Sequence, residues 1–486
     1  MFVMDGPQDP TGPIPGRPVP ARRSRRVAVR DGRGRRRYTL MVVLLATGII
    51  MFLILALLRG PDSESGDWQT HRATPADAFL DTVGVAMHHH YFDTAYGEHD
   101  LLAMLDRLGV RHIRDALTPQ SMEFYAAFVE QAGPGAGVSY VVNDGAEMPL
   151  EEQIRMLAGQ APGTASQIES DNEPDCDDWS NKEAQHYRVQ ARELRSLMDS
   201  YAVLRDVPLT TPSLCRTTRA AYTTYGDDGV SERFNMHPYA AGLLPEAEID
   251  EALRYARAAD PNAVPVVTEG GYHNAIETDG DHKPTSMLAE SAYLPQMFLE
   301  YNRRGIALTH TYELLDIRPD PDRDDDQKNF GLFHADGSIK PSGASMAALL
   351  DTLRDEDGER PQATDVELSI SGGGDQMRVH PFVRSDGSID VALWLAREIW
   401  DEDRRIDLPN PDAPVTVRVP SATEGSYVRI NGAEEPERVQ LACGTSFTVP
   451  VSAHPTILRI GPWPSGDWPG SVGPSRRAGE AKSSPC

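Results

Sequence analysis

The sequence predicts an α/β fold in which a (β/α)8 TIM barrel is preceded by one transmembrane helix and followed by a C-terminal antiparallel β-sandwich. Three observations favour this order. Short apolar runs alternate with amphipathic stretches in the middle of the chain, the periodicity becomes strand-like after residue 364, and an uncharged apolar run lies near the N-terminus. A chain of 486 residues is long enough for two or three domains.

Residues 1–38 predict a basic cytoplasmic tail, and residues 39–59 predict a transmembrane helix. The tail has ten arginines and three aspartates, a charge of +7, and because the whole chain has a net charge of −26, the residues after Tyr38 have −33. Residues 40–58 contain no charged side chain. At about 1.5 Å per residue they are long enough to span the hydrocarbon core of a bilayer. A cleaved signal peptide is the alternative, but its apolar region is usually shorter.

The arginines lie on the N-terminal side of the span, so the positive-inside rule places residues 60–486 outside the cytoplasm. The sequence thus predicts a single-pass cell-membrane protein with a linker at 60–77, the bilayer as the partner of residues 40–58, and no nucleic-acid partner. The absence of Asn-x-Ser/Thr sequons and the arginine-rich tail indicate a bacterial origin. Disulfides are permitted in this location, and we expect Cys176 to pair with Cys215, with free buried cysteines as the alternative.

Residues 78–355 contain eight short apolar runs that end in polar residues, and we interpret them as the strands of the barrel. Their starts are 26 to 42 residues apart, and one strand–helix unit needs about 30 residues. The runs are 83–87, 110–115, 138–143, 167–172, 207–212, 233–237, 264–269 and 306–312. Amphipathic stretches lie between them, at 100–108, 181–201, 246–259 and 286–302. An open doubly wound sheet is the alternative, but no Gly-x-Gly-x-x-Gly follows the first run.

Residues 364–461 have the pattern of a β-sandwich, because short β-rich runs recur between Gly, Asp, Asn and Pro residues. The runs are 366–370, 377–383, 389–395, 415–419, 427–430, 447–451 and 456–460. Residues 462–486 are rich in Pro, Gly and Ser and predict a disordered tail.

Polar side chains gather at the C-terminal ends of the predicted barrel strands, where barrels of this type place their active sites. Glu173 follows the fourth run and Glu269 ends the seventh, about three strand–helix units apart, so we expect them to face one another across the barrel mouth. Cleavage of a glycosidic bond needs two carboxyl groups in one cleft, one protonated and one ionised. The sequence therefore indicates glycosidase chemistry.

Two motifs carry a resemblance to a known group of enzymes. Ser-Asp-Asn-Glu-Pro at 170–174 and Val-Val-Thr-Glu-Gly-Gly-Tyr at 266–272 resemble the signatures of glycoside hydrolase clan A, TIM-barrel retaining glycosidases that include families 5, 10, 39 and 79. Ile-Arg-Asp at 113–115 and Met-His-Pro-Tyr at 236–239 resemble its supporting motifs. The resemblance covers residues 78–355 and, more loosely, the sandwich.

The resemblance implies that Glu173 is the acid/base and Glu269 the nucleophile of a retaining O-glycosyl hydrolase. It also implies roles for residues around them. Asn172 would hydrogen-bond the sugar 2-hydroxyl, Arg114 and Tyr239 would keep Glu269 ionised, and His237 would line the same sugar-binding subsite. The last strand of this clan commonly ends in a tryptophan under the sugar, where this chain has Tyr312. We expect Tyr312 to serve as that platform, and His88, His90 and Asn143 to contact the substrate.

These features predict a membrane-anchored, extracytoplasmic retaining glycosidase that acts on an envelope or extracellular poly- or oligosaccharide. A catalytically silent carbohydrate-binding or envelope-assembly protein is one alternative, and a transglycosylase with the same two glutamates is another. We expect no cofactor and no metal, because successive histidines on a strand point to opposite faces. Gly-x-Ser-x-Gly, zinc-type Cys/His spacing and a phosphate loop are all missing from the sequence. The sequence gives neither the sugar and its linkage nor the oligomeric state.

Overall fold

The computed structural model describes residues 67–142, 148–176, 179–280, 282–355 and 359–462. The predicted cytoplasmic tail (1–38), the transmembrane span (40–58) and residues 463–486 of the predicted C-terminal tail lie outside these ranges. Within the described ranges, we find no helix long and apolar enough to cross a bilayer. The membrane anchor therefore stays a prediction from sequence.

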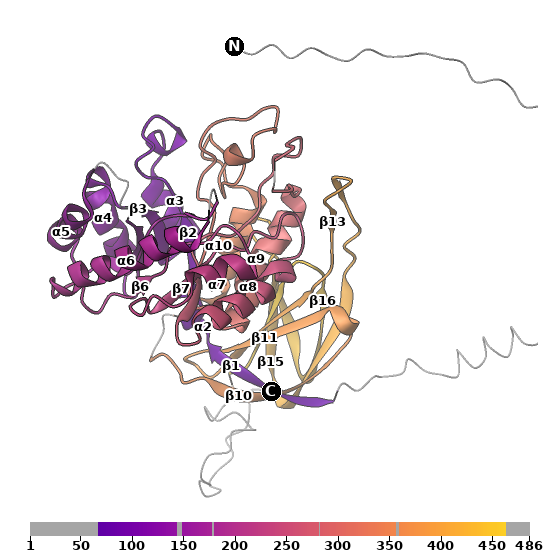
Figure 1. The fold of residues 1–486 in the computed structure, drawn as a ribbon. Coiled ribbons are helices and arrows are strands. Elements are labelled where there is room, and N and C mark those ends of the chain that lie inside the picture. The colour runs from indigo at the N-terminus through magenta and orange to yellow at the C-terminus, as the bar shows by residue number, and fades with distance from the viewer. Residues whose placement is uncertain (1–66, 143–147, 177–178, 281, 356–358, 463–486) are drawn as a thin grey trace, which may run out of the picture. The chain divides into compact units, whose positions relative to one another are not determined.

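Eight parallel strands close into a barrel in the order in which they occur along the chain (Figure 1). The last strand pairs with the first, from Val83 opposite Thr309 to Val85 opposite Thr311. This closure confirms the predicted barrel. The strands are β2 (Val83–Ala86), β3 (His112–Ala116), β4 (Gly137–Val141), β5 (Ala165–Glu169), β6 (Leu209–Thr210), β7 (Arg233–Met236), β8 (Val264–Val267) and β9 (Thr309–Thr311).

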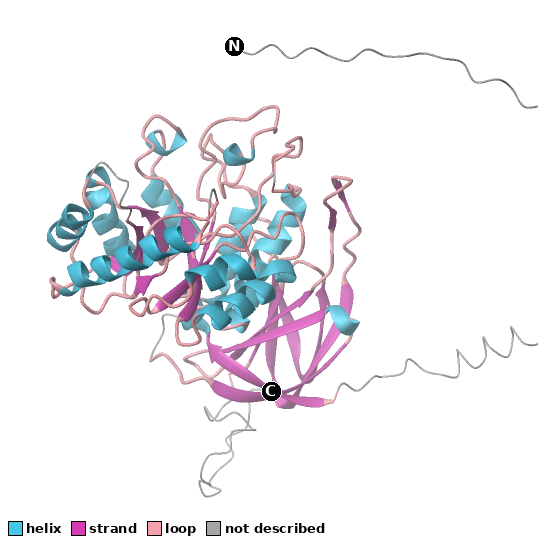
Figure 2. Cartoon of the chain, in the orientation of Figure 1, coloured by secondary structure: helices cyan, strands magenta, loops and turns pink. Residues whose placement is uncertain are grey.

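Helices lie between successive barrel strands, and their ends follow local sequence signals (Figure 2). Asp100 accepts a hydrogen bond from the backbone N–H of Ala103 at the start of α3, and Gly109 ends that helix in the left-handed conformation that glycine favours. Ser286 caps α9 in the same way. The helices are α2 (Ala76–Leu80), α3 (Leu101–Leu108), α4 (Met122–Ala132), α5 (Leu150–Gln160), α6 (Asn181–Asp199), α7 (Arg219–Tyr225), α8 (Glu246–Ala259), α9 (Met287–Arg303) and α10 (Pro341–Leu353).

The second domain is a seven-stranded sheet in the order β10-β1-β11-β12-β17-β15-β16, in which β10 also pairs with β15. Its strand β1 precedes the barrel in the chain and pairs with β10 and β11, as the indigo strand among the orange and yellow ones shows in Figure 1. The strands are β1 (Trp68–Pro75), β10 (Thr364–Ser371), β11 (Met377–Val383), β12 (Ile389–Leu395), β15 (Ala413–Arg429), β16 (Arg438–Val451) and β17 (Thr456–Ile460).

The linker predicted at 60–77 is therefore wrong for its described part, because residues 68–75 form a sheet strand. The sequence signal was weak, since only Ala73 of this strand is fully buried in the sandwich core. The predicted runs 415–419 and 427–430 belong to the single strand β15. Between them the strand buries only small side chains such as Thr423 and Gly425, so hydrophobic alternation stops there. A Cβ at Gly425 would collide with the ring of Phe447.

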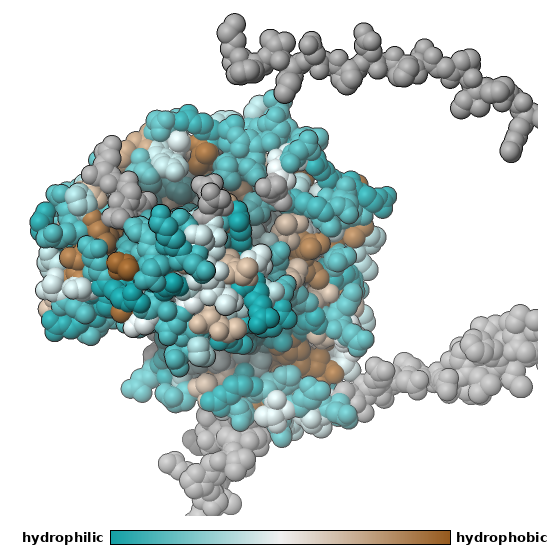
Figure 3. Space-filling view, in the orientation of Figure 1, coloured by the Kyte–Doolittle hydropathy of each residue, from teal (hydrophilic) through white to brown (hydrophobic). Residues whose placement is uncertain are grey.

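One apolar core surrounds the barrel strands and their helices and extends to side chains of the second domain such as Phe382 and Trp394, and a second core lies within the β-rich domain itself. The face drawn in Figure 3 is largely hydrophilic, with apolar side chains in scattered small groups. Burial of the apolar side chains in these two cores is the main favourable contribution to the folded state.

A hairpin from the second domain contacts the barrel loop that follows β8. It consists of β13 (Trp400–Asp401) and β14 (Ile406–Asp407). The Trp400 indole N–H donates to the Pro284 carbonyl at 2.7 Å, and the Arg405 guanidinium donates to the carbonyls of Ile276 and Thr278 at 2.7 and 2.6 Å. The hairpin thus contacts this loop at Ile276, Thr278 and Pro284, and His282 of the same loop forms part of the wall of the site described below.

Two buried histidines of the second domain contact helix α9 of the barrel. His380 Nε2 lies 2.7 Å from Asn302 Oδ1, and His454 Nε2 lies 3.0 Å from Ser291 Oγ. Burial lowers the pKa of His380 to about 3, with a further contribution from the positive charge of Arg303. Burial likewise lowers the pKa of His454 to about 4. Both side chains are therefore neutral in the folded protein at neutral pH.

Acidification is expected to weaken the fold through these histidines. Their folded-state pKa values lie below the unfolded value of about 6.5, so between pH 6.5 and about 4 the unfolded chain binds more protons and stability falls as pH falls. Each histidine contributes up to about 1.4 kcal/mol per pH unit. Urea unfolding of wild type and His380→Gln at pH 7.0, 5.5 and 4.5 checks this. The stability difference between wild type and the variant should shrink as the pH falls; a constant difference would contradict the assignment.

Candidate active site

A cavity of about 300 Å³ lies at the C-terminal ends of the barrel strands. Its wall comes from loops after five different strands, and it contains both glutamates that the sequence singled out. The lining residues are His88, Tyr91, Asn172, Glu173, Tyr239, Glu269, His282, Tyr312, Gln327 and Phe330. Carboxylates, an amide and several aromatic rings thus share one small concave site, which is the composition expected of a binding site for a polar organic ligand.

Glu269 is buried and is bound through both carboxylate oxygens. The Arg114 guanidinium donates to Oε1, and the Tyr239 hydroxyl donates to Oε2 at 2.8 Å. Burial alone would raise the pKa of Glu269, but the positive charges of His237 and Arg114 and the hydrogen bonds from Tyr239 and Arg114 outweigh it, so the pKa lies below the usual value. Glu269 is therefore ionised and fixed in orientation at neutral pH.

Arg114 is itself held in place by a second buried carboxylate. Its guanidinium donates to Glu169 twice, from Nε at 2.9 Å and from Nη2 at 2.7 Å, and Nη2 also donates to Asn172 Oδ1 at 2.7 Å. The side chain of Glu169 is fully buried. A guanidinium binds two carboxylates well because its donors form a rigid planar fork. Glu169 thus places Arg114 against Glu269 and Asn172.

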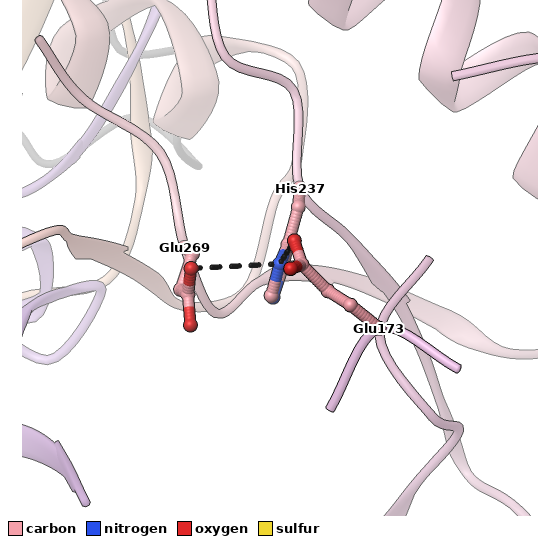
Figure 4. Close-up of side chains that lie close together, drawn as sticks. All are labelled: Glu173, His237 and Glu269. Carbon is pink, nitrogen blue, oxygen red and sulfur yellow. Dashed lines mark hydrogen bonds and ion pairs between the residues drawn. The ribbon is translucent and has the colours of Figure 1, made fainter. Parts of the chain in front are cut away.

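Glu173 lies opposite Glu269, with His237 between them, as Figure 4 shows. His237 Nδ1 is 2.7 Å from Glu173 Oε1 and 3.7 Å from Glu269 Oε2, and His237 Nε2 is 2.9 Å from Thr268 Oγ1. Burial would lower the pKa of His237, but the charges of Glu269 and Glu173 raise it overall. A quarter of the Glu173 side chain is exposed, so this carboxyl can reach a bound ligand.

The backbone at Glu173 has a φ of 49°, in the left-handed region that only a few percent of non-glycine residues adopt. The Glu173 N–H donates to Ser213 Oγ at 3.0 Å, and the Ser213 hydroxyl donates to Asn172 Oδ1 at 3.2 Å. Unusual backbone conformations of this kind occur often at functional sites, where the surrounding structure holds them. Ser213 links the backbone of Glu173 to the side chain of Asn172.

The two carboxylates are close together. One oxygen of Glu173, one nitrogen of His237 and one oxygen of Glu269 all lie within 4.8 Å of one another. Such side chains could also hold a metal ion, but the Arg114 guanidinium already contacts Glu269 and its positive charge opposes a divalent cation. The arrangement is suited to a reaction in which one carboxylate is kept ionised and the other exchanges a proton.

A second network of mostly buried side chains connects His88, Tyr312, Glu313 and Tyr96. His88 Nε2 is 3.0 Å from the Tyr312 hydroxyl and 3.5 Å from Glu313 Oε2, and the Tyr96 hydroxyl donates to Glu313 Oε2 at 2.9 Å. Burial raises the pKa of Glu313 well above its usual value, although the bond from Tyr96 opposes the rise. Burial lowers the pKa of His88. Burial thus disfavours the charged form of both groups, and their hydrogen bonds fix the edge of the cavity at Tyr312.

The structure brings together most of the residues predicted for the site: Arg114, Asn172, Glu173, His237, Tyr239, Glu269, His88 and Tyr312. His90 is not among the lining residues; its Nδ1 is 3.7 Å from Asp115 Oδ1. Asn143 lies outside the described residues. Cys176 and Cys215 form a disulfide with a Cα separation of 5.8 Å, in the loops after β5 and β6.

Sequence reasoning assigned no role to several residues of the site, namely Glu169, Glu313, Thr268, Ser213, His282, Gln327 and Phe330. Usable signals existed for Glu169, which occupies a barrel-strand position where a buried apolar side chain is usual, and for Glu313, which directly follows the last predicted strand run. His282, Gln327 and Phe330 come from long loops, and spacing along the chain gives no indication of how those loops fold over the strands.

The fold and the site together define a (β/α)8-barrel protein with two carboxylates at the ends of β5 and β8. Models of known protein families give no match to the sequence, and neither does any curated protein. Solved structures with a similar fold include a family 39 glycoside hydrolase from Bacteroides cellulosilyticus, with a TM-score of 0.54 and 16% identity over 80% of this chain and 81% of that one.

Two further structures are similar to the same extent. A family 39 enzyme from Xanthomonas axonopodis pv. citri has a TM-score of 0.54 at 14% identity, over 81% of this chain and 96% of that one. A family 39 β-xylosidase from Caulobacter crescentus has a TM-score of 0.53 at 14% identity, over 81% of this chain and 98% of that one. At these identities the likeness shows a shared fold, which includes the barrel and the appended β-domain.

Proposed function

We propose that this protein is a retaining glycoside hydrolase in which Glu269 is the nucleophile and Glu173 the general acid and base. The observation that carries the proposal is the carboxylate pair, whose nearest oxygens lie within 4.8 Å of one another. Retaining glycosidases place their two carboxyl groups about 5 to 5.5 Å apart, whereas inverting enzymes need about 6.5 to 9.5 Å to admit a water molecule. The shared fold with family 39 enzymes supports the same reaction class.

In the first step, the ionised Glu269 attacks the anomeric carbon while Glu173 gives its proton to the oxygen of the leaving group. The bond to the leaving group breaks, and a covalent glycosyl ester forms on Glu269. Arg114 and Tyr239 hold the attacking carboxylate in a single orientation, which reduces the entropy lost on reaching the transition state.

In the second step, the Glu173 carboxylate takes a proton from water as the water attacks the anomeric carbon and releases Glu269. The bond from His237 Nδ1 keeps the Glu173 carboxyl pointed into the cavity in both steps. Asn172 uses its side-chain oxygen for Arg114 and Ser213, which leaves its amide N–H group for the 2-hydroxyl of the sugar.

The stereochemistry of the first product tests the proposal. Residues 60–486 would be incubated with p-nitrophenyl glycosides of common hexoses and pentoses, and the released sugar would be followed by proton NMR before it mutarotates. Retention of the anomeric configuration is expected. Inversion would exclude Glu269 as nucleophile. Binding of glycans without any cleavage would instead favour a carbohydrate-binding protein, and transfer of the sugar to an added acceptor in place of water would favour a transglycosylase.

We also propose that the enzyme is anchored in the cell membrane by residues 40–58 and acts outside the cytoplasm on an envelope or extracellular polysaccharide. The uncharged span and the arginines before it support this topology. The disulfide between Cys176 and Cys215 also supports it, because such bonds persist mainly in oxidising compartments. A protease added to intact spheroplasts should cleave the domains after residue 60; complete protection would contradict this topology.

A further inference from the structure

A series of ring contacts runs from the cavity to the protein surface across the loop after β2. The Tyr312 and His88 rings have centroids 5.6 Å apart, and His88 stacks on Tyr91 with centroids 4.6 Å apart and an interplanar angle of 10°. The next residue, Phe92, contacts His89 edge-to-face at 5.4 Å. The series from the cavity ends at Tyr91, whereas the Phe92 contact belongs to a separate group of rings around His89. Tyr91 and Phe92 are the exposed rings of this loop, and we call these two residues the aromatic ledge.

The aromatic ledge is exposed although it is built from large rings. Tyr91 is 37% exposed and lines the cavity, and Phe92, the next residue in the chain, is 53% exposed. An exposed ring gives little stability to its own fold, because it remains in contact with water. A flat ring in this position can instead cover the apolar C–H face of a sugar, because aromatic side chains offer a large apolar surface for contact.

Hydrogen bonds hold the loop that carries the aromatic ledge in place. The Tyr91 N–H donates to the His88 carbonyl at 2.9 Å, the Thr94 hydroxyl donates to the Tyr91 carbonyl at 2.7 Å, and the His89 N–H donates to Asp115 Oδ2 at 2.9 Å. A surface that is already ordered loses little conformational entropy when a ligand binds. The aromatic ledge therefore has the rigidity of a preformed binding surface.

The order of the strands gives the side of the site on which the aromatic ledge lies. In the closed barrel, β2 lies between β9 and β3, three strands away from β5, and Glu173 lies in the loop that follows β5. Because Glu173 protonates the oxygen of the leaving group, the leaving group lies toward β5. The β2 side is therefore the side of the sugar that is transferred to Glu269. The cavity of about 300 Å³ is at the lower end of the size range of ligand pockets, so a second sugar on this side has to lie outside it.

We propose that Tyr91 and Phe92 form a second glycone subsite, which stacks on the sugar that precedes the cleaved residue. This inference rests on the proposed glycosidase function and deepens it. The substrate is then a chain with at least two sugars on the non-leaving side, and single terminal sugars are poorer substrates.

The experiment compares two probes that differ by one sugar. The probes are pairs of p-nitrophenyl glycosides and the corresponding p-nitrophenyl biosides, made from glucose, xylose, mannose or galactose. Wild type is tested on every pair, and the pair that it cleaves best is chosen. The quantity measured is kcat/KM for the bioside divided by kcat/KM for the glycoside. Phe92→Ala and Tyr91→Ala are each expected to lower this ratio about tenfold. Tyr91→Phe keeps the ring and should keep the ratio.

Trp68→Ala is the matched control, because Trp68 is a similarly exposed aromatic residue, 46% exposed, on strand β1 of the second domain. Its ratio should equal that of wild type. An unchanged ratio in both Phe92→Ala and Tyr91→Ala would overturn the second subsite while leaving the glycosidase proposal standing. Failure of wild type to cleave any probe would overturn both. Melting temperatures of the variants verify that each is folded.

Discussion

Replacing Glu269 with alanine is expected to lower kcat for p-nitrophenyl glycosides on the order of 10⁴-fold or more, because no carboxylate remains to attack the anomeric carbon. Sodium azide should restore turnover in this variant, since azide can occupy the space of the missing carboxylate. It then attacks from the same face, so the glycosyl azide formed has the opposite anomeric configuration from the substrate.

Glu173→Ala should respond to azide in the opposite stereochemical sense. In that variant Glu269 still forms the glycosyl ester, so azide displaces Glu269 and gives a product with the configuration of the substrate. The exposed Glu277, in the same loop as Glu269, is a matched control, and Glu277→Ala should keep wild-type activity. NMR of the two glycosyl azides decides the assignment. The same configuration from both variants would show that the roles of the two glutamates are wrong.

Replacing Arg114 with methionine is expected to destabilise the fold by about 3 to 5 kcal/mol, the usual cost of removing one partner from a buried ion pair. The Arg114 guanidinium is bound to Glu169 and Glu269, and the Glu169 side chain has no exposed surface. Methionine would leave the Glu169 charge buried without a cation. Urea unfolding at pH 7 measures the change.

A double variant separates the ion pair from simple packing. Arg114→Met combined with Glu169→Gln removes both charges, and it should recover part of the stability lost in Arg114→Met alone. Arg404→Met is the control: this arginine is exposed and forms a loose ion pair with Asp401 at 3.7 Å, so its loss should cost less than about 1 kcal/mol. Strictly additive effects of the two substitutions would contradict the direct pairing of Arg114 with Glu169.

The sequence predicted the barrel because each strand–helix unit is local, with the strand, the turn and the helix all encoded within about 30 residues. Glu173 and Glu269 could be located for the same reason, since each lies within a few residues of the end of its strand. Glu313 could be noticed at a strand end, but its burial and its bond to Tyr96 depend on a loop that is more than 200 residues away in the chain. Strand β1 was missed on similar grounds, because its partners β10 and β11 lie on the far side of the barrel sequence.

Strand β1 has a consequence for how the protein is made. Trp68 pairs with Ser369 and Ala73 with Thr364, so about 300 residues separate the two sides of this ladder. During synthesis, β1 therefore emerges first and stays without its partners until the whole barrel has been translated, and contacts of such long range form slowly. Unpaired strands invite association with other chains. Most side chains of this strand are polar, and Pro75 lies at its end. Such features reduce association of an unpaired strand with other chains until β10 and β11 have been synthesised.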